Sequence, residues 1–187
     1  MQRPAAAPRH VLAIEPLSAV AFRPFGDVIE AAAHTHHYTI NAGYAERFHD
    51  LARIDTGGDG GNALVSIFRA KPRSFPLELS LVERHALGSQ AFVPLAPLRF
   101  LVVVAAPGPA PQPHQLRCFL AAPGQGINLA RGVWHHPLLA LDAGGDFLVI
   151  DRGAPRATDD DCEELPLAAV WIGQADGEAT PAGMSQL

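Results

Sequence analysis

The sequence predicts an all-β fold, a sandwich or barrel with few short helices, and three observations support this. Glycine and proline are frequent, with 17 of each in 187 residues, which favours many tight turns. Hydrophobic residues make up 48% of the chain, enough to fill a sizeable core. Short segments with β-sheet composition recur along the chain, most of them separated by turns that contain glycine or proline.

The N-terminal part is predicted to hold short, irregular elements. We expect residues 1–9 to be disordered and 10–17 to form a short edge strand. Residues 18–25 predict a brief helix with Ser18 as its N-cap. The segment 34–49 is rich in histidine and aromatic residues but follows neither the helical nor the strand period, so we expect an ordered loop with short strands.

From residue 63 onward the strand signal is steady. The expected strands span residues 63–69, 77–85, 90–94, 100–106, 116–121, 132–141, 147–151 and 168–172. Because the sequence shows neither a repeat nor a change of composition, we expect one catalytic domain over residues 10–172. Residues 173–187 are polar and small, and predict a flexible tail.

Composition argues against several classes of protein. The net charge is −5, from 14 basic and 19 acidic residues, and this disfavours nucleic acid as a partner. The two cysteines, Cys118 and Cys162, have no Cys-x-x-Cys spacing, so we expect reduced thiols. The first ten residues lack the apolar region of a signal peptide, and the longest apolar stretch, 100–109, is too short to span a bilayer. We therefore expect a cytoplasmic protein without a membrane partner.

Polar residues with strand spacing occur in the segment ERHALGSQ, residues 83–90. Residues i and i+2 of a strand point to the same face, so Glu83 and His85 would both point into a barrel. Gln90 follows the Gly88-Ser89 turn and can return to the same interior. Such a group of oxygen and nitrogen atoms suits a divalent metal or acid–base catalysis.

A second segment, GQGINLARGVWHHPLL at residues 124–139, places Gly132 three residues before His135. The two segments, about 50 residues apart, resemble in order and spacing the two motifs of the cupin superfamily. Those motifs carry His-x-His, then a carboxylate, and later a single histidine. The resemblance implies a cupin-like β-barrel in which His135 faces Glu83, His85 and Gln90 from another strand.

The chain departs from the cupin pattern at two positions. Glu83 replaces a histidine, and Gln90 replaces a carboxylate. A neutral amide oxygen binds transition metals weakly, so a metal at this site would be held less firmly than in a typical cupin. Two roles therefore stay open. Glu83, His85, Gln90 and His135 would be ligands to a divalent metal, or Glu83, His85 and His135 would be acid–base groups that act without one.

Over residues 11–165 the sequence resembles the ureidoglycolate lyase family. The matching strings are FGDVI (25–29), INAG (40–43), RFHDL (47–51), RAKP (69–72), ERHALGSQAFVP (83–94), GVWHHPL (132–138), and DF (146–147) with IDRG (150–153). The resemblance implies a cupin-like barrel, a homodimer, a role in allantoin catabolism, and an association with nickel, with no organic cofactor. The small-molecule substrate would be ureidoglycolate, cleaved to glyoxylate and urea.

This reaction needs a base for the substrate hydroxyl, an acid for the leaving nitrogen and a cation for the carboxylate. The expected groups are Glu83, His85 and His135 for catalysis, Arg69 and Lys71 for the carboxylate, and Asn41 or Gln90 for the ureido group. Two other functions stay open. One is an amidohydrolase that releases ammonia from the same substrate. The other is a non-catalytic cupin that senses a small carboxylate.

Some neighbouring residues are expected to have structural roles. We expect Trp134 to lie in the core, and His136 to point away from His135 and pack outside the cavity or at a dimer contact. Asp151 and Arg152 are expected to form a structural ion pair, which could border the site. The histidines of the 34–49 segment are expected to be loop residues rather than metal ligands.

Overall fold

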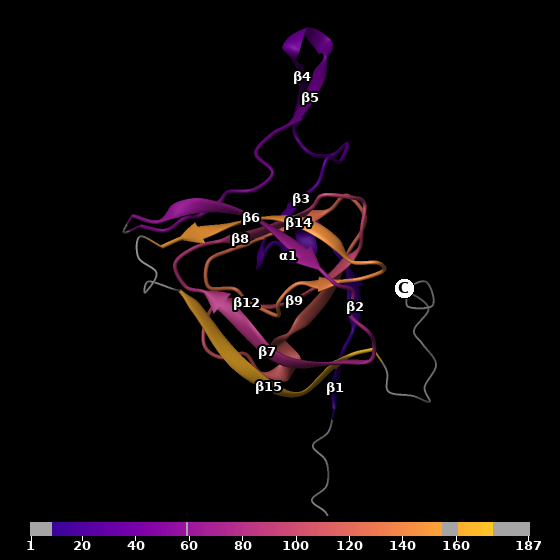
Figure 1. Ribbon diagram of the computed structural model, residues 1–187, viewed down its shortest axis with the longest axis vertical. Helices are drawn as coiled ribbons and strands as arrows, with labels where there is room; N and C mark the ends of the chain where they lie inside the picture. The colour runs from indigo at the N-terminus through magenta and orange to yellow at the C-terminus, as the bar shows by residue number, and fades with distance from the viewer. Residues whose placement is uncertain (1–8, 59, 155–160, 174–187) are drawn as a thin grey trace, which may run out of the picture.

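The computed structural model describes residues 9–58, 60–154 and 161–173. Strands dominate, and they form a nearly closed barrel, which confirms the all-β, cupin-like prediction (Figure 1). An eight-stranded sheet and a five-stranded sheet make the barrel, and a two-stranded hairpin projects from it.

The eight-stranded sheet curls because its two edge strands are consecutive in the chain. Its order is β1-β15-β7-β12-β9-β10-β2, with β13 also paired to β9. The first two strands are separated by Ala13 alone, yet β1 pairs with β15 and β2 with β10, at opposite edges. The bounds are β1 His10–Leu12, β2 Ile14–Pro16, β7 Leu77–His85, β9 Phe100–Ala105, β10 Arg117–Ala121, β12 Trp134–His135, β13 Leu139–Ala140 and β15 Cys162–Ile172.

The five-stranded sheet lies opposite, in the order β3-β11-β8-β14-β6. Its bounds are β3 Gly26–Ile29, β6 Asn62–Ala70, β8 Gln90–Pro94, β11 Gly126–Leu129 and β14 Gly145–Gly153. The remaining elements are β4 His37–Ile40, the 3₁₀ turn η1 Asn41–Gly43 and β5 Ala45–Phe48 in the projecting hairpin, helix α1 Ala19–Phe22, and the 3₁₀ turn η2 Pro113–Gln115. Helix α1 begins where predicted, since the Ser18 side chain accepts a hydrogen bond from the Ala21 amide.

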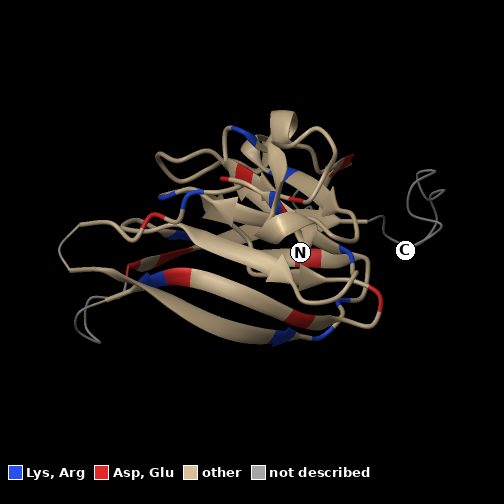
Figure 2. Ribbon diagram, turned by 90° about the horizontal axis from the view of Figure 1, so that it is seen from above, with Lys and Arg blue, Asp and Glu red and all other residues tan. Residues whose placement is uncertain are grey.

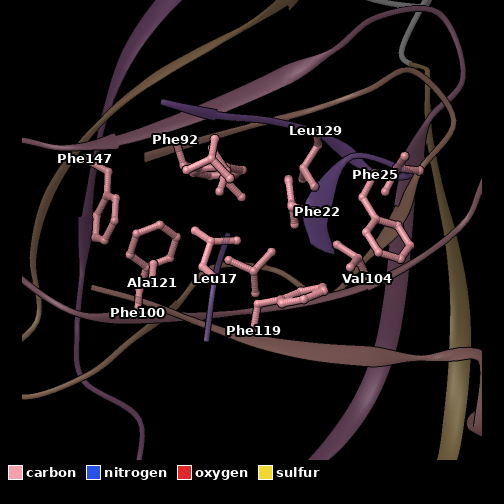
Figure 3. Packing of buried hydrophobic residues seen from close by; sticks show 14 of the residues in the cluster. Leu17, Phe22, Phe25, Phe92, Phe100, Val104, Phe119, Ala121, Leu129 and Phe147 are labelled. Carbon is pink, nitrogen blue, oxygen red and sulfur yellow. The ribbon is translucent and has the colours of Figure 1, made fainter. Parts of the chain in front are cut away.

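Strand β9 is buried on both faces and therefore joins two hydrophobic clusters. Phe100, Val102 and Val104 belong to the barrel interior, where Phe22, Phe25 and Phe119 pack edge to face or tilted (Figure 3). Leu101, Val103 and Ala105 belong to a second cluster beneath β7 and β15. This position explains why residues 100–105 read as an unbroken apolar run rather than an alternating strand.

Trp134 joins the second cluster and is almost fully buried, which confirms its predicted core position. Cys118, beside it in the same cluster, is a buried thiol, and burial, with a smaller contribution from the charge of Glu15, raises its pKa to about 12. Such a thiol stays protonated and unreactive at neutral pH.

The strand predictions differ from the structure in several places. The single strand expected over 10–17 is divided into β1 and β2, with Ala13 between them. The single strand expected over 132–141 is divided into β12 and β13, because Pro137 has no amide hydrogen to donate to a sheet. Strands β3 and β11 were not predicted. The last strand, β15, begins at Cys162 rather than at residue 168, and its pairing with β7 shifts register between Pro166 and Val170.

The predicted disordered N-terminus and flexible tail lie outside the described residues, apart from Arg9 and Gly173. Arg9 stacks on Trp171 with its guanidinium carbon 4.5 Å from the ring centroid, so the predicted disorder does not extend to Arg9. Acidic and basic residues lie side by side on the outer strands and loops (Figure 2), where pairs such as Arg69–Asp146 and Arg131–Asp55 join them. None of the helices among the described residues is long and apolar enough to cross a membrane.

Candidate active site

Three of the predicted site residues come together where β7 meets β12. Glu83 of β7 lies directly opposite His135 of β12 in the antiparallel ladder, and His85 is two residues further along β7. Ligand atoms of these three residues all lie within 4.8 Å of one another. We call Glu83, His85 and His135 the triad.

The triad is shielded from solvent but still accessible. His135 Nε2 lies 3.4 Å from Glu83 Oε1, and the two imidazole rings are 5.6 Å apart between centroids. The side chain of His135 is 3% exposed, while those of Glu83 and His85 are each 19% exposed. The thiol of Cys162 also approaches Glu83, with Sγ 3.9 Å from Oε2.

Hydrogen bonds orient both imidazoles. His135 Nδ1 lies 3.0 Å from the Val133 carbonyl oxygen, so Nδ1 must carry the proton that is donated. His85 Nδ1 lies 3.4 Å from Asp161 Oδ1, which favours the same tautomer. The Nε2 atoms of both histidines are buried and lack a hydrogen-bond partner among the described residues. In the neutral form of each ring, a proton on Nδ1 leaves Nε2 as the nitrogen that can bind a metal or accept a proton.

Asp161 is a candidate site residue that the sequence analysis did not identify. Its Oδ2 accepts a hydrogen bond from the Leu87 amide, and its carbonyl accepts one from the Ala86 amide. It therefore fixes both the His85 ring and the turn that follows His85. Asp161 is 76 residues from His85 in sequence and belongs to neither cupin-like motif, so the sequence holds no signal that would connect the two.

The surroundings set the charge of the triad. Burial raises the pKa of Glu83, but the contact with His135 lowers it more, so the carboxyl has a pKa below its ordinary value. Burial lowers the pKa of His136, only partly opposed by its hydrogen bond to the Pro137 carbonyl. At neutral pH the site therefore combines an ionised carboxylate with a neutral His136.

A small cavity adjoins the triad. It contains about 240 Å³ of space not filled by atoms, part of it open to solvent, and His135 and His136 line it with apolar residues of both sheets: Phe92, Phe100, Leu101, Val102, Ile127, Leu129 and Leu138. The prediction that His136 packs outside the cavity was wrong. Strand β12 ends at His135, so the strict alternation of a strand does not extend to His136.

Gln90 lies at the same end of the barrel interior. Its side chain is buried and its neighbour across the ladder, Leu129, lines the cavity. Its Oε1 is buried without a hydrogen-bond partner among the described residues. The structure therefore places Gln90 beside Leu129, a residue of the cavity wall.

The other predicted substrate contacts lie away from the triad within one chain. Arg69 is 83% exposed and forms a bidentate ion pair with Asp146. Arg69 lies near the C-terminal end of β6, whereas Gln90 is level with the N-terminal end of that strand. Lys71 is exposed and follows the end of β6. Asn41 starts the turn η1 at the tip of the projecting β4–β5 hairpin (Figure 1).

Comparison with known proteins identifies the family. A family model described as Ureidoglycolate lyase matches residues 9–172. A ureidoglycolate lyase of Burkholderia cepacia is 52% identical over 161 residues, which cover 86% of this chain and 89% of that protein. One of Azotobacter vinelandii is 53% identical over 142 residues, covering 76% and 85%. This chain belongs to the ureidoglycolate lyase family.

Among solved structures, a dTDP sugar isomerase from Desulfovibrio desulfuricans is similar to the chain with a TM-score of 0.41 and 17% identity, over 76% of this chain and 86% of that one. This similarity is too low to support an argument. The match to the ureidoglycolate lyase family, by contrast, includes the triad, Gln90 and every strand of the barrel.

One further expectation within the family match was wrong. Asp151 and Arg152 do not form an ion pair, since they point to opposite faces of β14. Arg152 donates from Nε to the Thr56 carbonyl and packs against Gly88 in the turn after His85. Asp151 Oδ1 is buried and has no hydrogen-bond partner among the described residues.

Proposed function

We propose that this chain is a ureidoglycolate lyase, which cleaves ureidoglycolate into glyoxylate and urea in allantoin catabolism in the cytoplasm. The observation that carries the proposal is the triad, a buried carboxylate and two oriented imidazoles beside a small cavity, in a member of the ureidoglycolate lyase family. Relatives that share about half of their residues with this chain are named ureidoglycolate lyase.

The reaction requires two proton transfers and no water. The carbon atom of ureidoglycolate that reacts bears a hydroxyl, a carboxylate and a urea nitrogen. Loss of the hydroxyl proton forms the carbonyl of glyoxylate as the carbon–nitrogen bond breaks, and the electron pair leaves on nitrogen. Protonation of that nitrogen releases urea. One base and one acid are therefore sufficient, and neither has to be a nucleophile.

Without a metal, the triad would supply both proton transfers. In its neutral form His135 would accept the hydroxyl proton at Nε2, and the ionised Glu83 at 3.4 Å would stabilise the imidazolium that results. The same imidazolium then returns the proton to the leaving nitrogen. Asp161 holds the His85 ring in place beside this pair.

The triad also fits a divalent metal. Two buried Nε2 atoms that have no hydrogen-bond partner among the described residues, with one carboxylate, are a common ligand set for a transition metal, and they leave positions open for substrate oxygens. The residues that would hold the ion are Glu83, His85 and His135. Nickel is the ion that the resemblance implies, and a bound divalent ion would act as a Lewis acid toward the substrate hydroxyl and carboxylate.

Among the predicted substrate contacts, we keep Gln90 for the ureido group, because its amide is buried and its ladder neighbour Leu129 lines the cavity. Arg69, Lys71 and Asn41 are left out of the proposed site because they lie away from the triad within one chain. The tentative role of Gln90 as a fourth metal ligand is not needed, since three ligands already satisfy the proposal.

Purified protein incubated with ureidoglycolate tests the function directly, with glyoxylate, urea and ammonia all measured. A lyase releases glyoxylate and urea in equal amounts and no ammonia. Ammonia in place of urea would identify an amidohydrolase, and binding without any product would identify a sensor. A variant with Glu78→Gln is a suitable control, because it neutralises an exposed carboxylate of β7 at the end of the strand away from the triad.

We also propose that the protein is a homodimer. Strand β6 is the free edge of the five-stranded sheet, and it exposes Leu64, Val65, Ile67 and Phe68, which are 41–69% accessible. A long, exposed, apolar edge is a surface on which strands of another chain pair, and a second copy would cover it. Sedimentation at micromolar concentration should give twice the mass of one chain.

A further inference from the structure

Two buried hydrogen-bond acceptors on neighbouring strands have no assigned partner. They are Oε1 of Gln90 on β8 and Oδ1 of Asp151 on β14, and both lack a hydrogen-bond partner among the described residues. A buried acceptor that is left unsatisfied costs free energy, so each such group in a folded protein needs an explanation.

Strand alternation places both acceptors on the interior face of the five-stranded sheet. Phe147 and Val149 of β14 are fully buried in the barrel core, and Asp151 follows them at the same two-residue spacing. On β8, Phe92 lines the cavity, and Gln90 precedes it by two residues. Phe92, Phe147 and Leu129 all point into this interior (Figure 3).

The strand register places the two acceptors next to each other. Val149 pairs with Phe92 and Ile150 with Ala91, so the next positions along the two strands are Asp151 and Gln90. Side chains that face each other across antiparallel strands have Cβ atoms about 5 Å apart. Gln90 is in turn paired on its other side with Leu129, which lines the cavity beside His135.

The adjacent Arg152 does not neutralise Asp151. Its side chain points to the other face of β14, where its Nε donates to the Thr56 carbonyl. A carboxylate with a buried, unpartnered oxygen beside a second unpartnered acceptor is a group whose position is explained by a ligand rather than by packing.

The chemistry of Asp151 and Gln90 indicates which kind of ligand they would bind. Two acceptors side by side match a group that presents two N–H donors along one edge, which a ureido group does and a carboxylate does not. We propose that Asp151 and Gln90 form the subsite that binds the ureido group of the substrate, with Asp151 as a specificity-determining residue. This inference rests on the proposed function and adds Asp151 to its site.

Binding of two unreactive probes separates this subsite from the rest of the site. Oxalurate keeps both the ureido group and the carboxylate of ureidoglycolate, but it has a carbonyl in place of the reacting carbinol. Glyoxylate has the carboxylate and no ureido group. Dissociation constants of both probes, measured by calorimetry on the full-length protein, are compared between wild type and Asp151→Asn.

Loss of a hydrogen bond to a charged acceptor weakens binding by roughly tenfold to a hundredfold. We expect Asp151→Asn to raise the dissociation constant of oxalurate by at least about tenfold and to leave that of glyoxylate within about twofold. Gln90→Leu should act in the same direction, and it serves as the test if Asp151→Asn does not fold. The control Glu78→Gln, an exposed carboxylate-to-amide change, should alter neither constant.

Several outcomes would overturn the inference. Equal weakening of both probes would show that Asp151 acts on the whole site, and unchanged oxalurate binding would show that it does not contact the ureido group. Wild-type protein that binds oxalurate no more tightly than glyoxylate would have no ureido subsite. The proposed lyase activity is tested by a different experiment, since the binding comparison needs no turnover. That activity is disproved if the wild-type protein releases no glyoxylate and urea.

Discussion

At the scale of single residues, the two histidines of the triad are oriented in different ways. His135 donates to a carbonyl two residues before it, so its orientation is local to β12. His85 depends on Asp161, a side chain that reaches it from just before β15. Removing Asp161 would therefore release His85 while leaving His135 in place.

The two histidines proposed to act in catalysis give the first prediction. His85→Ala and His135→Ala should each lower kcat by about 10²- to 10⁴-fold, because each removes a group that transfers a proton or holds a metal. We expect the metal-assisted form, in which both variants also lose bound metal, a chelator abolishes wild-type activity, and one divalent ion restores it. Metal analysis and steady-state kinetics measure these effects.

His114→Ala is the matched control for these variants, since it removes an imidazole from the turn η2, outside the triad. If a chelator leaves wild-type activity intact while both triad variants are inactive, the histidines act as acid–base groups without a metal. Near-normal rates in both triad variants would place the active site elsewhere.

A second prediction concerns Asp55, which connects two loops near the triad. Hydrogen bonds from Arg131 and from the Gly57 amide lower the pKa of Asp55 below its ordinary value of 3.8. A carboxylate whose pKa is lower in the folded state stabilises the fold above its unfolded-state pKa, and this contribution is lost as the pH falls through the folded-state pKa.

Asp55→Asn should therefore lower the urea midpoint at pH 7, and the difference from wild type should shrink as the pH falls below about 3.8. Urea titrations of both proteins at several pH values measure the difference. A difference that stays constant at acid pH would mean that the Asp55 carboxylate is not the source of the stability.

At the scale of elements, alternation and turn residues were sufficient to predict the long strands. Residues 77–85 and 90–94 were predicted with the bounds that the structure shows, and these two strands carry Glu83, His85 and Gln90. Short strands could not be predicted in the same way. Strand β3 has four residues, and it is a strand because β11 pairs with it across about 100 residues of sequence, which no local pattern records.

The residues of the candidate site were likewise predictable only where a local sequence pattern carries them. The triad was predictable because two sequence segments carry it, and β7 and β12 pair at Glu83 and His135. Arg69 and Lys71 have the chemistry of carboxylate ligands, but nothing in the sequence shows at which end of the barrel they lie. Asp151 and Asp161 acquire their roles from strand register and loop packing, which appear only in three dimensions.

The turn between β7 and β8 gives a third prediction. A Cβ atom on Gly88 would lie 2.5 Å from Arg152 Cβ and 3.1 Å from the Asp55 carbonyl oxygen, so the turn closes against β14 because residue 88 lacks a side chain. Gly88→Ala should reduce the free energy of unfolding by about 1–3 kcal/mol. Gly58→Ala is the control, because a Cβ there meets nothing within 4 Å. Equal urea midpoints for the two variants would contradict the proposed close packing.

At the scale of the whole molecule, the curled eight-stranded sheet has little unpaired edge, whereas the five-stranded sheet ends in β6. The interior face of β6 packs into the barrel, where the ring of Phe68 contacts that of Phe92 at a centroid distance of 6.1 Å. The outward side chains Val65 and Ile67 are 69% and 54% exposed. Val65 and Ile67 therefore form an apolar surface that a single chain leaves open to water, and a homodimer through β6 would cover it.

The last prediction tests this interface. Val65→Lys places a charge in the middle of the exposed edge, and lysine on an edge strand opposes pairing with another chain. The variant should raise the dimer dissociation constant by at least about tenfold, because a buried, unpaired charge costs more than about 1.4 kcal/mol. Val20→Lys is the matched control, since Val20 is 83% exposed on helix α1, away from β6. Sedimentation equilibrium at several concentrations measures the dimer dissociation constant of both variants. A dissociation constant that Val65→Lys changes no more than Val20→Lys would show that β6 does not form the interface.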